Sequence, residues 1–210
     1  MSSARFEYAP DSQYDYAPGT RAECPLRSCP LWGSRIVPPE LNPYSVAWLV
    51  GEAPGKDEEE SGLPFVGKSG RELNMYLKRF TRIPRERFSV GNILRCRPPG
   101  NRDPHADEIS HCESRLILDL DEHRPSIVAA VGRVSARWFL GCLVRMEKVH
   151  GLVFERAGRI IVPVYHPAAG LHSPRRMSDT IRDFSILGEV IRGERGITHM
   201  SEIQSEYGVG

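Results

Sequence analysis

The sequence predicts an α/β fold in which a mostly parallel sheet lies between two layers of helices. Four short apolar segments of strand length alternate with four longer segments in which apolar residues recur at helical spacing. Such an alternation is typical of strands joined by right-handed helical crossovers, with a ligand crevice beyond the carboxyl ends of the strands. The order of the segments is β-α-β-α-β-α-β-α.

Each element follows from its own pattern. The predicted strands are VAWLV (46–50), FSVGNIL (88–94), SIVAAV (126–131) and RIIVPVY (159–165). The middle two alternate poorly between apolar and polar residues, as expected of central strands that are covered on both faces. The predicted helices are SGRELNMYLKRF (69–80), ADEISHCESRLILDLDEH (106–123), RVSARWFLGCLV (133–144) and SDTIRDFSILGEVIR (178–192).

The length and local composition indicate one folded domain with two tails. A chain of 210 residues suits a single domain. Residues 1–22 are rich in Pro, Ser, Asp and Tyr without a sustained apolar period, so we expect a flexible N-terminal arm. We expect the domain to span residues 23–195 and a C-terminal tail to span 196–210. No internal repeat or low-complexity tract is present.

Charge and hydropathy exclude some classes of function. The 28 Lys and Arg nearly balance the 27 Asp and Glu, so any contact with nucleic acid must come from local basic patches. No apolar stretch approaches the roughly 20 residues that cross a bilayer, and the N-terminus lacks the pattern of a signal peptide. We therefore expect a cytoplasmic monomer without membrane contact. Five cysteines, an odd number, argue against a disulfide framework in a reducing compartment.

The octapeptide GLPFVGKS (62–69) matches the phosphate-binding loop of nucleotide hydrolases, G-x-x-x-x-G-K-[ST]. That loop needs a buried strand directly before it, whereas four acidic residues, Asp57 to Glu60, stand there and would repel a triphosphate. Pro64 also removes one amide donor from inside the cradle. Nucleotide hydrolysis therefore remains a weak alternative, with an anion contact by Lys68 or Ser69 still open.

Three longer segments carry a more specific resemblance. GEAPGKDEEESGLPFVGKSG (51–70), NILRCRPPGNRDP (92–104) and VYHPAAGLH (164–172) each follow a predicted strand. Together they resemble the signatures of the iron-sulfur uracil-DNA glycosylases, the fourth family of the uracil-DNA glycosylase superfamily. The resemblance covers about residues 24–192. It implies a three-layer sandwich with a central four-stranded, mostly parallel sheet, which agrees with the predicted order of elements.

The resemblance also implies roles for individual residues. In this family the first signature lines the base pocket, an aromatic ring stacks on the flipped base, an asparagine reads its edge and a histidine meets the developing anion. These roles fall on Glu52 with Ala53, Phe65, Asn92 and His166. An asparagine carries a donor and an acceptor that match the edge of uracil, and a neutral imidazole can donate to the leaving oxygen. Taken singly, each of these residues is more readily explained as an ordinary core, cap or turn residue than as part of a site.

The residue that activates water is left open by the sequence. Better-known members of the superfamily carry glutamine where this chain has Glu52, and some carry a water-activating aspartate where it has Ala53. The resemblance pairs Glu52 with Asn101, the asparagine after the double proline. Glu58 is the other acidic candidate in the loop, and the rest of the acidic run is interpreted as a solvated loop face.

Four cysteines form two pairs that suit a metal centre. Cys24 and Cys29 are separated by four residues, and Cys96 and Cys112 by fifteen. Four thiolates suit a [4Fe-4S] cluster or a tetrahedral zinc ion. The resemblance favours the cluster in a structural role, although the first spacing is longer than is usual in the family. Zinc is the alternative, plain buried thiols are a weaker one, and Cys142 is interpreted as packing on an apolar helix.

A glycosylase must also hold DNA from which one nucleotide is turned out of the stack. Basic residues in the second and third segments are candidates for phosphate contacts, and Leu171 is the candidate wedge that fills the vacated space. The third segment departs from its relatives in reading HPAAGLHSPRR, and exposed arginines are often only surface ion pairs. The basic candidates are Arg95, Arg97, Arg102, His172, Arg175 and Arg176.

These features predict an enzyme that hydrolyses the N-glycosidic bond of uracil in DNA and leaves an abasic site. We expect a monofunctional glycosylase because the motifs contain no obvious lysine nucleophile. One alternative keeps the chemistry but excises a modified or other deaminated base. Another is a non-catalytic iron-sulfur module that binds DNA.

Overall fold

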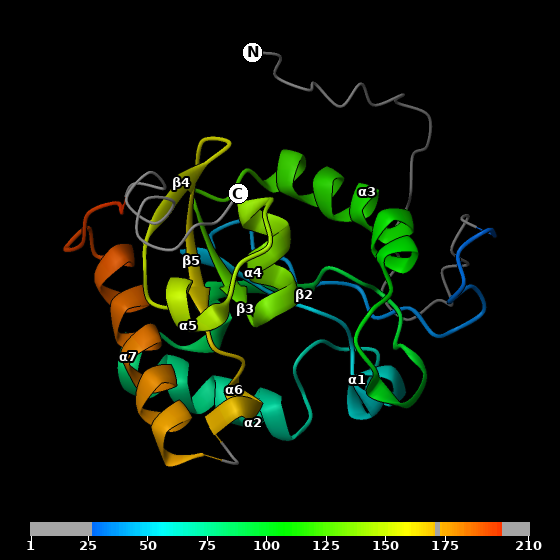
Figure 1. Cartoon of the computed structure of the whole chain (residues 1–210), viewed down its shortest axis with the longest axis horizontal. Coiled ribbons are helices and arrows are strands. Elements are labelled where there is room, and N and C mark those ends of the chain that lie inside the picture. Colours follow the sequence, from blue (N-terminus) through cyan, green and yellow to red (C-terminus); the bar gives the residue numbers. More distant parts are fainter. Residues whose placement is uncertain (1–26, 171–172, 199–210) are drawn as a thin grey trace.

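The computed structural model describes residues 27–170 and 173–198. The predicted arm 1–22 and most of the predicted tail 196–210 lie outside these residues, so the domain boundaries stay a prediction. The described part forms an α/β sandwich with one central sheet (Figure 1). The predicted fold class is therefore confirmed.

The sheet has five strands in the order β2-β1-β3-β5-β4. Four are parallel neighbours and correspond to the predicted strands: β1 (Ala47–Gly51), β2 (Phe88–Asn92), β3 (Ile127–Val131) and β5 (Arg159–Val164). The fifth, β4 (Phe154–Arg156), is antiparallel to β5 at the sheet edge and raises the predicted count by one. Its three residues contain a single buried side chain, which is too little to produce a strand pattern in the sequence.

The helices include all four that the sequence predicts and several short ones that it does not. The bounds are α1 (Lys56–Ser61), α2 (Lys68–Tyr76), a π-helical turn η1 (Leu77–Thr81), 3₁₀ turns η2 (Arg85–Arg87) and η3 (Pro99–Asn101), α3 (Ala106–His123), α4 (Arg133–Leu140), α5 (Met146–Val149), α6 (Pro167–Gly170) and α7 (Pro174–Ile191).

Two predicted helix ends are displaced for local reasons. The helix predicted to run to residue 144 stops at Leu140, because Gly141 takes a left-handed conformation with φ 66° and caps the helix. The last helix begins four residues early, since Ser173 accepts a hydrogen bond from the Arg176 amide at 3.4 Å and Pro174 occupies the first turn.

Helices cover both faces of the sheet. On one face α3, α4 and α5 pack on inward-facing residues such as Trp48 and Val128. On the other, α2 and α7 pack on the alternate residues of the same strands, such as Leu49 and Ala129. Figure 1 shows the two layers, with α3 and α4 on one side of the strands and α2 and α7 on the other. Burial on both faces explains why the central strands read as continuous apolar runs.

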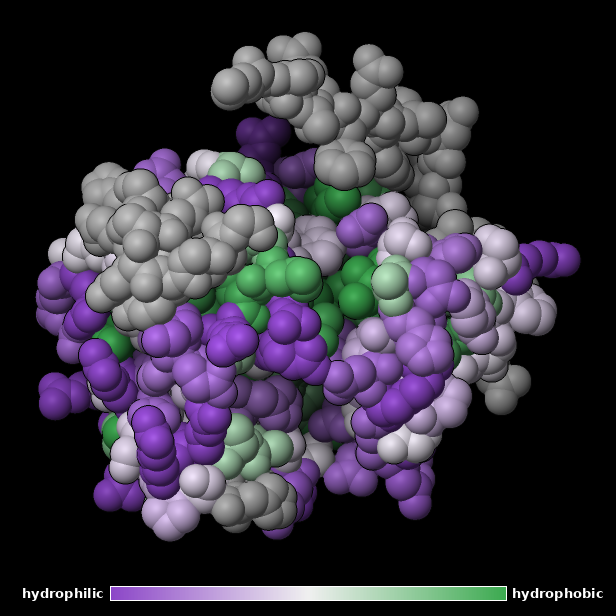
Figure 2. All heavy atoms as spheres, viewed as in Figure 1, coloured by the Kyte–Doolittle hydropathy of each residue, from purple (hydrophilic) through white to green (hydrophobic). Residues whose placement is uncertain are grey.

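The surface is mostly hydrophilic on the face that Figure 2 presents. Purple residues dominate it, and green hydrophobic residues gather over α4 and toward α3. Among residues 27–170 and 173–198, no helix has the length and apolar character that crossing a bilayer requires.

Candidate active site

The three segments singled out in the sequence leave the same edge of the sheet. β1, β2 and β5 are all parallel, so their carboxyl ends lie together. Within that edge Gly51 is in register with Asn92, and amides after β2 donate to the carbonyls of Gly51 and Glu52, each at 3.0 Å. The sheet itself therefore brings the first and second segments side by side.

A cavity of about 340 Å³ opens at this edge. All seven residues to which the sequence assigned catalytic or base-binding roles line it, although they come from three different loops. The lining includes Glu52, Ala53, Glu58, Phe65, Asn92, Asn101 and His166, together with Lys68, Ser69 and Arg102. The volume is in the range of small-molecule sites, and the mixture of one aromatic ring with convergent polar groups suits a planar heterocycle.

Phe65 forms one wall of the cavity. Its side chain is 5% exposed, and its ring centroid lies 6.0 Å from that of His166. The residue has φ 53°, a left-handed conformation that is uncommon for a bulky side chain and costs on the order of 1 kcal/mol. A β-carbon at Gly51 would collide with both the Phe65 ring and Asn92 Oδ1. Glycine at the end of β1 thus allows these two side chains to approach each other.

Glu58 holds the loop that carries Phe65. Its carboxylate accepts hydrogen bonds from three backbone amides, at 3.1 Å from Gly55, 3.0 Å from Val66 and 2.8 Å from Gly67. Glu58 belongs to helix α1, whereas the sequence predicted an acidic loop at this position. A carboxylate that accepts three amides is well suited to fixing the backbone.

Asn92 ends β2 and is 4% exposed. Its carbonyl accepts a hydrogen bond from Arg95 Nη1 at 3.3 Å, and Arg95 forms an ion pair with Asp119. Arg95 is only 1% exposed, so the expectation that it contacts DNA phosphates was wrong. The physical reason is that Arg95 lies beneath the pocket, where Asp119 compensates its charge and its guanidinium supports the Asn92 backbone.

His166 follows β5 and is held as a neutral imidazole. Burial lowers its pKa to about 4, an effect that the charge of Glu58 only partly opposes. Nδ1 accepts a hydrogen bond from the Ala168 amide at 3.3 Å, which leaves the ring hydrogen on Nε2. The ring can therefore act as a hydrogen-bond donor in the cavity at neutral pH.

Glu52 is partly buried immediately after β1. Its pKa is raised to about 7, mainly by burial and also by the charge of Asp103, while the charge of Arg133 acts in the opposite direction. Asp103 and Arg133 form an ion pair with each other. Neither of these two residues was predicted from the sequence to lie at the site. Arg133 begins α4 directly after β3, so the rule that crevice loops follow parallel strands could have identified it.

Beside Arg95, the second segment contains two further arginines that are engaged with protein groups. Arg97 donates from Nε to Asn101 Oδ1 at 2.6 Å and pairs with Glu59 at 3.1 Å. Arg102 forms a bidentate pair with the buried Glu108, at 2.5 and 2.8 Å. These contacts order the loop around Asn101, which has φ 57°. Phosphate contacts by Arg97 and Arg102 remain predictions and would have to share these carboxylate partners.

The third segment is described only in part. The predicted wedge Leu171 and the predicted phosphate contact His172 lie outside the described residues. Arg175 is exposed in the first turn of α7. Arg176 donates to the Tyr165 hydroxyl and pairs with Glu147 at 2.7 Å. Tyr165 directly precedes His166 in the chain, so Arg176 also supports this loop.

Three of the four predicted metal ligands line one cavity. Cys29, Cys96 and Cys112 lie around it, and the Arg95 amide donates to Cys112 Sγ at 3.3 Å. Cys24 lies outside the described residues. Within the described residues, no group of three or more His, Cys, Asp or Glu side chains is arranged to hold a metal ion. Cys142 packs against the core as predicted, but it is only partly buried and lies just after α4 rather than on that helix.

The octapeptide 62–69 is not built as a phosphate cradle. It follows helix α1 rather than a strand, and Gly62 caps that helix with φ 78°. The segment then carries Phe65 into the cavity and leads into α2 at Lys68. The weak alternative of a nucleotide-hydrolase loop loses the strand-loop-helix geometry that it requires.

Comparisons with known proteins agree with this geometry. Residues 38–185 match the sequence model of the Uracil DNA glycosylase superfamily. The chain is 34% identical over 174 residues to a protein named type-4 uracil-DNA glycosylase from Sulfurisphaera tokodaii, covering 78% of this chain and 79% of that protein. It is also 34% identical to one from Archaeoglobus fulgidus, with 78% and 87% covered. For one from Thermotoga maritima the identity is 33%, with 67% and 75% covered. The chain therefore belongs to the uracil-DNA glycosylase superfamily and, within it, to the type-4 family.

Proposed function

We propose that this protein is an enzyme that removes uracil from DNA by hydrolysing its N-glycosidic bond and leaves an abasic site. The observation that carries this proposal is that Phe65, Asn92, His166 and Glu52 all line one cavity. Membership in the type-4 family supports the same activity. A cavity at a sheet edge can receive only a base that has left the DNA stack, so the reaction requires base flipping.

The pocket residues divide the reaction between recognition and charge stabilisation. The Phe65 ring stacks on the extruded uracil, and Asn92 pairs with its polar edge. As the bond from the sugar to the base nitrogen breaks, negative charge spreads onto a carbonyl oxygen of the leaving uracil, and His166 donates a hydrogen bond from Nε2 to that oxygen. Positive charge develops on the sugar, where ionised Glu52 stabilises it and orients the attacking water. As the water adds to the sugar carbon, Glu52 accepts the proton that it loses and returns this proton to solvent, from which the released uracil anion is protonated.

The proposed function is tested by measuring which bases leave DNA. Oligonucleotides that each contain one uracil, one hypoxanthine or one oxidised pyrimidine are incubated with the protein, and the released base is identified by mass. We expect free uracil and a strand break only after alkali. Preferential release of another base would support the alternative substrate. Normal DNA binding without release of any base would indicate a non-catalytic module.

The raised pKa of Glu52 predicts a pH dependence of the rate. Because the ionised form is the active one, uracil release should rise as pH increases through about 7 and level off above it. In Glu52→Gln the rate should be lower at every pH, and the rising limb of the pH profile near pH 7 should disappear. The measurement is the single-turnover rate from pH 5.5 to 9. A limb that persists unchanged in Glu52→Gln would exclude Glu52 as the titrating group.

The same pKa has a consequence for stability. The pKa of Glu52 in the folded state, about 7, lies above the ordinary 4.5, so protonation favours the folded state at low pH and this contribution is lost as pH rises through 7. Glu52→Gln should therefore gain stability over the wild type as pH increases from 5 to 8. Allowing for solvent screening, the gain is about 1 kcal/mol, or roughly 2–4 °C in melting temperature. The melting temperature of both proteins across this range tests it.

We further propose that Cys24, Cys29, Cys96 and Cys112 hold a [4Fe-4S] cluster, with zinc as the alternative. Support comes from the three cysteines around one cavity and from the amide that donates to Cys112 Sγ, a contact typical of metal-bound thiolates. Such a cluster supplies a structural cross-link. Its thiolate ligands would join the segment around Cys29 to the loop that begins at Cys96 and to α3, close to the pocket wall.

The metal proposal predicts a visible spectrum. Protein purified without oxygen should be brown with a broad absorption at the blue end of the visible spectrum, and Cys112→Ser should lose the colour and much of its stability, because one thiolate ligand is missing. Cys142→Ser is the matched control and should keep the spectrum. Colourless protein that contains stoichiometric zinc would instead support the zinc site.

A further inference from the structure

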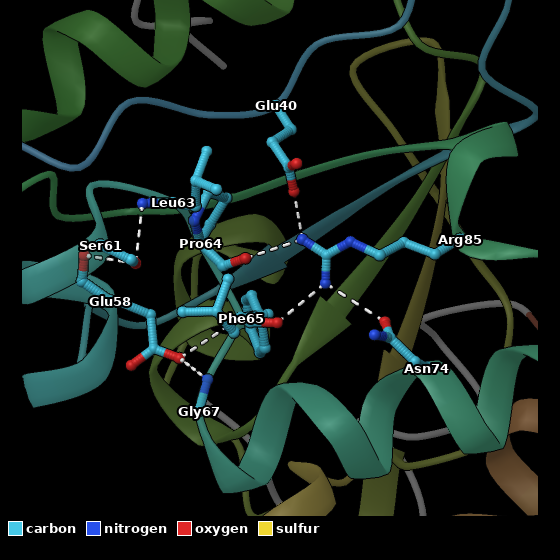
Figure 3. A network of polar contacts seen from close by, with 10 residues as sticks. Glu40, Glu58, Ser61, Leu63, Pro64, Phe65, Gly67, Asn74 and Arg85 are labelled. Atoms are coloured by element: carbon cyan, nitrogen blue, oxygen red, sulfur yellow. Dashed lines mark hydrogen bonds and ion pairs between the residues drawn. The ribbon is translucent and has the colours of Figure 1, made fainter. Parts of the chain in front are cut away.

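The Arg85 side chain lies behind the wall of the base pocket. Arg85 opens η2, its side chain is 17% exposed, and it is not among the residues that line the cavity. Figure 3 shows its guanidinium group among Glu40, Asn74 and the Pro64–Phe65 backbone. Nη2 donates to the Pro64 carbonyl at 2.7 Å, and Nη1 donates to the Phe65 carbonyl at 2.9 Å and to Asn74 Oδ1 at 3.2 Å.

The backbone that Arg85 contacts is one that needs support. Phe65 has φ 53°, which an aromatic residue adopts only when its surroundings impose it. On the other side of this residue Glu58 accepts the amides of Val66 and Gly67, at 3.0 and 2.8 Å. The Arg85 guanidinium therefore holds the carbonyls of Pro64 and Phe65. The Glu58 carboxylate holds the two amides that follow (Figure 3).

Arg85 is itself anchored to rigid elements. Glu40, its ion-pair partner, exchanges two backbone hydrogen bonds of 2.8 Å with Val90 in the middle of β2. Asn74 belongs to α2, which begins just after the loop. Packing adds a further constraint, since a β-carbon at Gly70 would collide with the Phe65 carbonyl. The loop is thus tied to the sheet and to a helix through one guanidinium group.

We propose that Arg85 is a positioning residue that orients the Phe65 ring for stacking on the extruded base. This inference rests on the proposed function. The planar guanidinium group reaches two adjacent carbonyls and two side chains at once, which the single ammonium group of lysine cannot do. Without Arg85, the left-handed residue relaxes and its ring leaves the plane against which a uracil would stack.

The first test compares a reaction that needs the base with a binding event that does not. Arg85→Ala should lower the single-turnover rate of uracil release by about 10–100-fold, because small misplacements of a reacting group have effects of this size. Its affinity for DNA with an abasic site should stay within about twofold of the wild type, since that ligand has no base to stack. The rate of uracil release by Arg85→Lys should lie between those of the wild type and Arg85→Ala. Arg87→Ala is the matched control: this arginine is exposed in the same turn and should keep full activity.

A double-mutant cycle then separates positioning from general stability. If Arg85 acts through Phe65, then Arg85→Ala should cost less than about threefold in a Phe65→Leu background, whereas independent sites would combine additively. Equal losses in both backgrounds, or a parallel fall in affinity for abasic DNA, would overturn the inference. If Arg85→Ala does not fold, Arg85→Lys serves in the same cycle. A wild-type protein that releases no uracil would overturn the proposed function and this inference with it, whereas an active wild type with an additive cycle overturns the inference alone.

Discussion

Asn92→Ala is expected to lower the rate of uracil release by about 10²–10³-fold or more, the effect of removing a preorganised hydrogen-bonding group from a dry site. Asn92 is buried at the end of β2, and its backbone is fixed by Gly51 on one side and by Arg95 on the other. Asn92 lines the cavity, and its side-chain amide carries both a donor and an acceptor. Alanine leaves the polar edge of a bound uracil without partners, and unpaired buried groups weaken binding strongly.

The measurement is single-turnover release of uracil from DNA that contains one uracil, with enzyme in excess. Asn92→Asp is an informative second variant, because it keeps the shape but replaces the amide donor by an acceptor. Ser89→Ala is the matched control; Ser89 is a buried polar residue at the other end of the same strand, bonded to Asn42 rather than to the cavity. An Asn92→Ala enzyme that keeps more than about a tenth of the rate would mean that this residue does not read the base.

His166→Leu is expected to have the second-largest effect, about 10²–10³-fold in the same rate. The loss has a specific origin: leucine cannot donate a hydrogen bond to the carbonyl oxygen of the base on which negative charge develops. The neutral state of His166 matters here. With a pKa of about 4, the ring donates without becoming an acid that titrates in the working range.

The pH profile distinguishes this role from general acid catalysis. The limb near pH 7 belongs to Glu52, so His166→Leu should keep that limb at its lower rate. Loss of the limb in His166→Leu would assign the titration to the imidazole and contradict its neutral state.

The pH dependence of stability offers a second check on the neutral state of His166. Because the pKa of His166 is lowered on folding, its contribution is present at high pH and is lost as pH falls from about 6.5 toward 4, and His166→Leu should abolish that loss.

Periodicity predicted the central architecture because the central elements are dominated by burial. The parallel strands β1, β2, β3 and β5 are covered on both faces, so their apolar runs report their position directly. The elements that the sequence did not predict are held by local contacts instead. Helix α1 contains no buried residue and owes its place to Glu58 and its amide partners. Strand β4 is fixed by a two-residue turn in which Ala157 and Gly158 both have positive φ.

The candidate site was predictable where residues follow strands directly. Asn92, Glu52 and His166 each lie within two residues of a strand end, and parallel topology alone brings them to one edge. What could not be predicted is which polar groups face inward. Arg95 resembled a surface arginine in the sequence, yet it is buried against Asp119. Arg85 lies in a different segment from Phe65, and only the folded chain shows that its guanidinium meets that backbone.

The measurement that tests the central claim most directly is a crystal structure of the wild-type protein with free uracil bound. The account predicts one uracil in the cavity at the sheet edge, with its ring parallel to that of Phe65, its polar edge on the Asn92 amide and a carbonyl oxygen within hydrogen-bonding distance of His166 Nε2. A uracil bound elsewhere on the protein, or lying in the cavity without contact to Asn92 and Phe65, would contradict it.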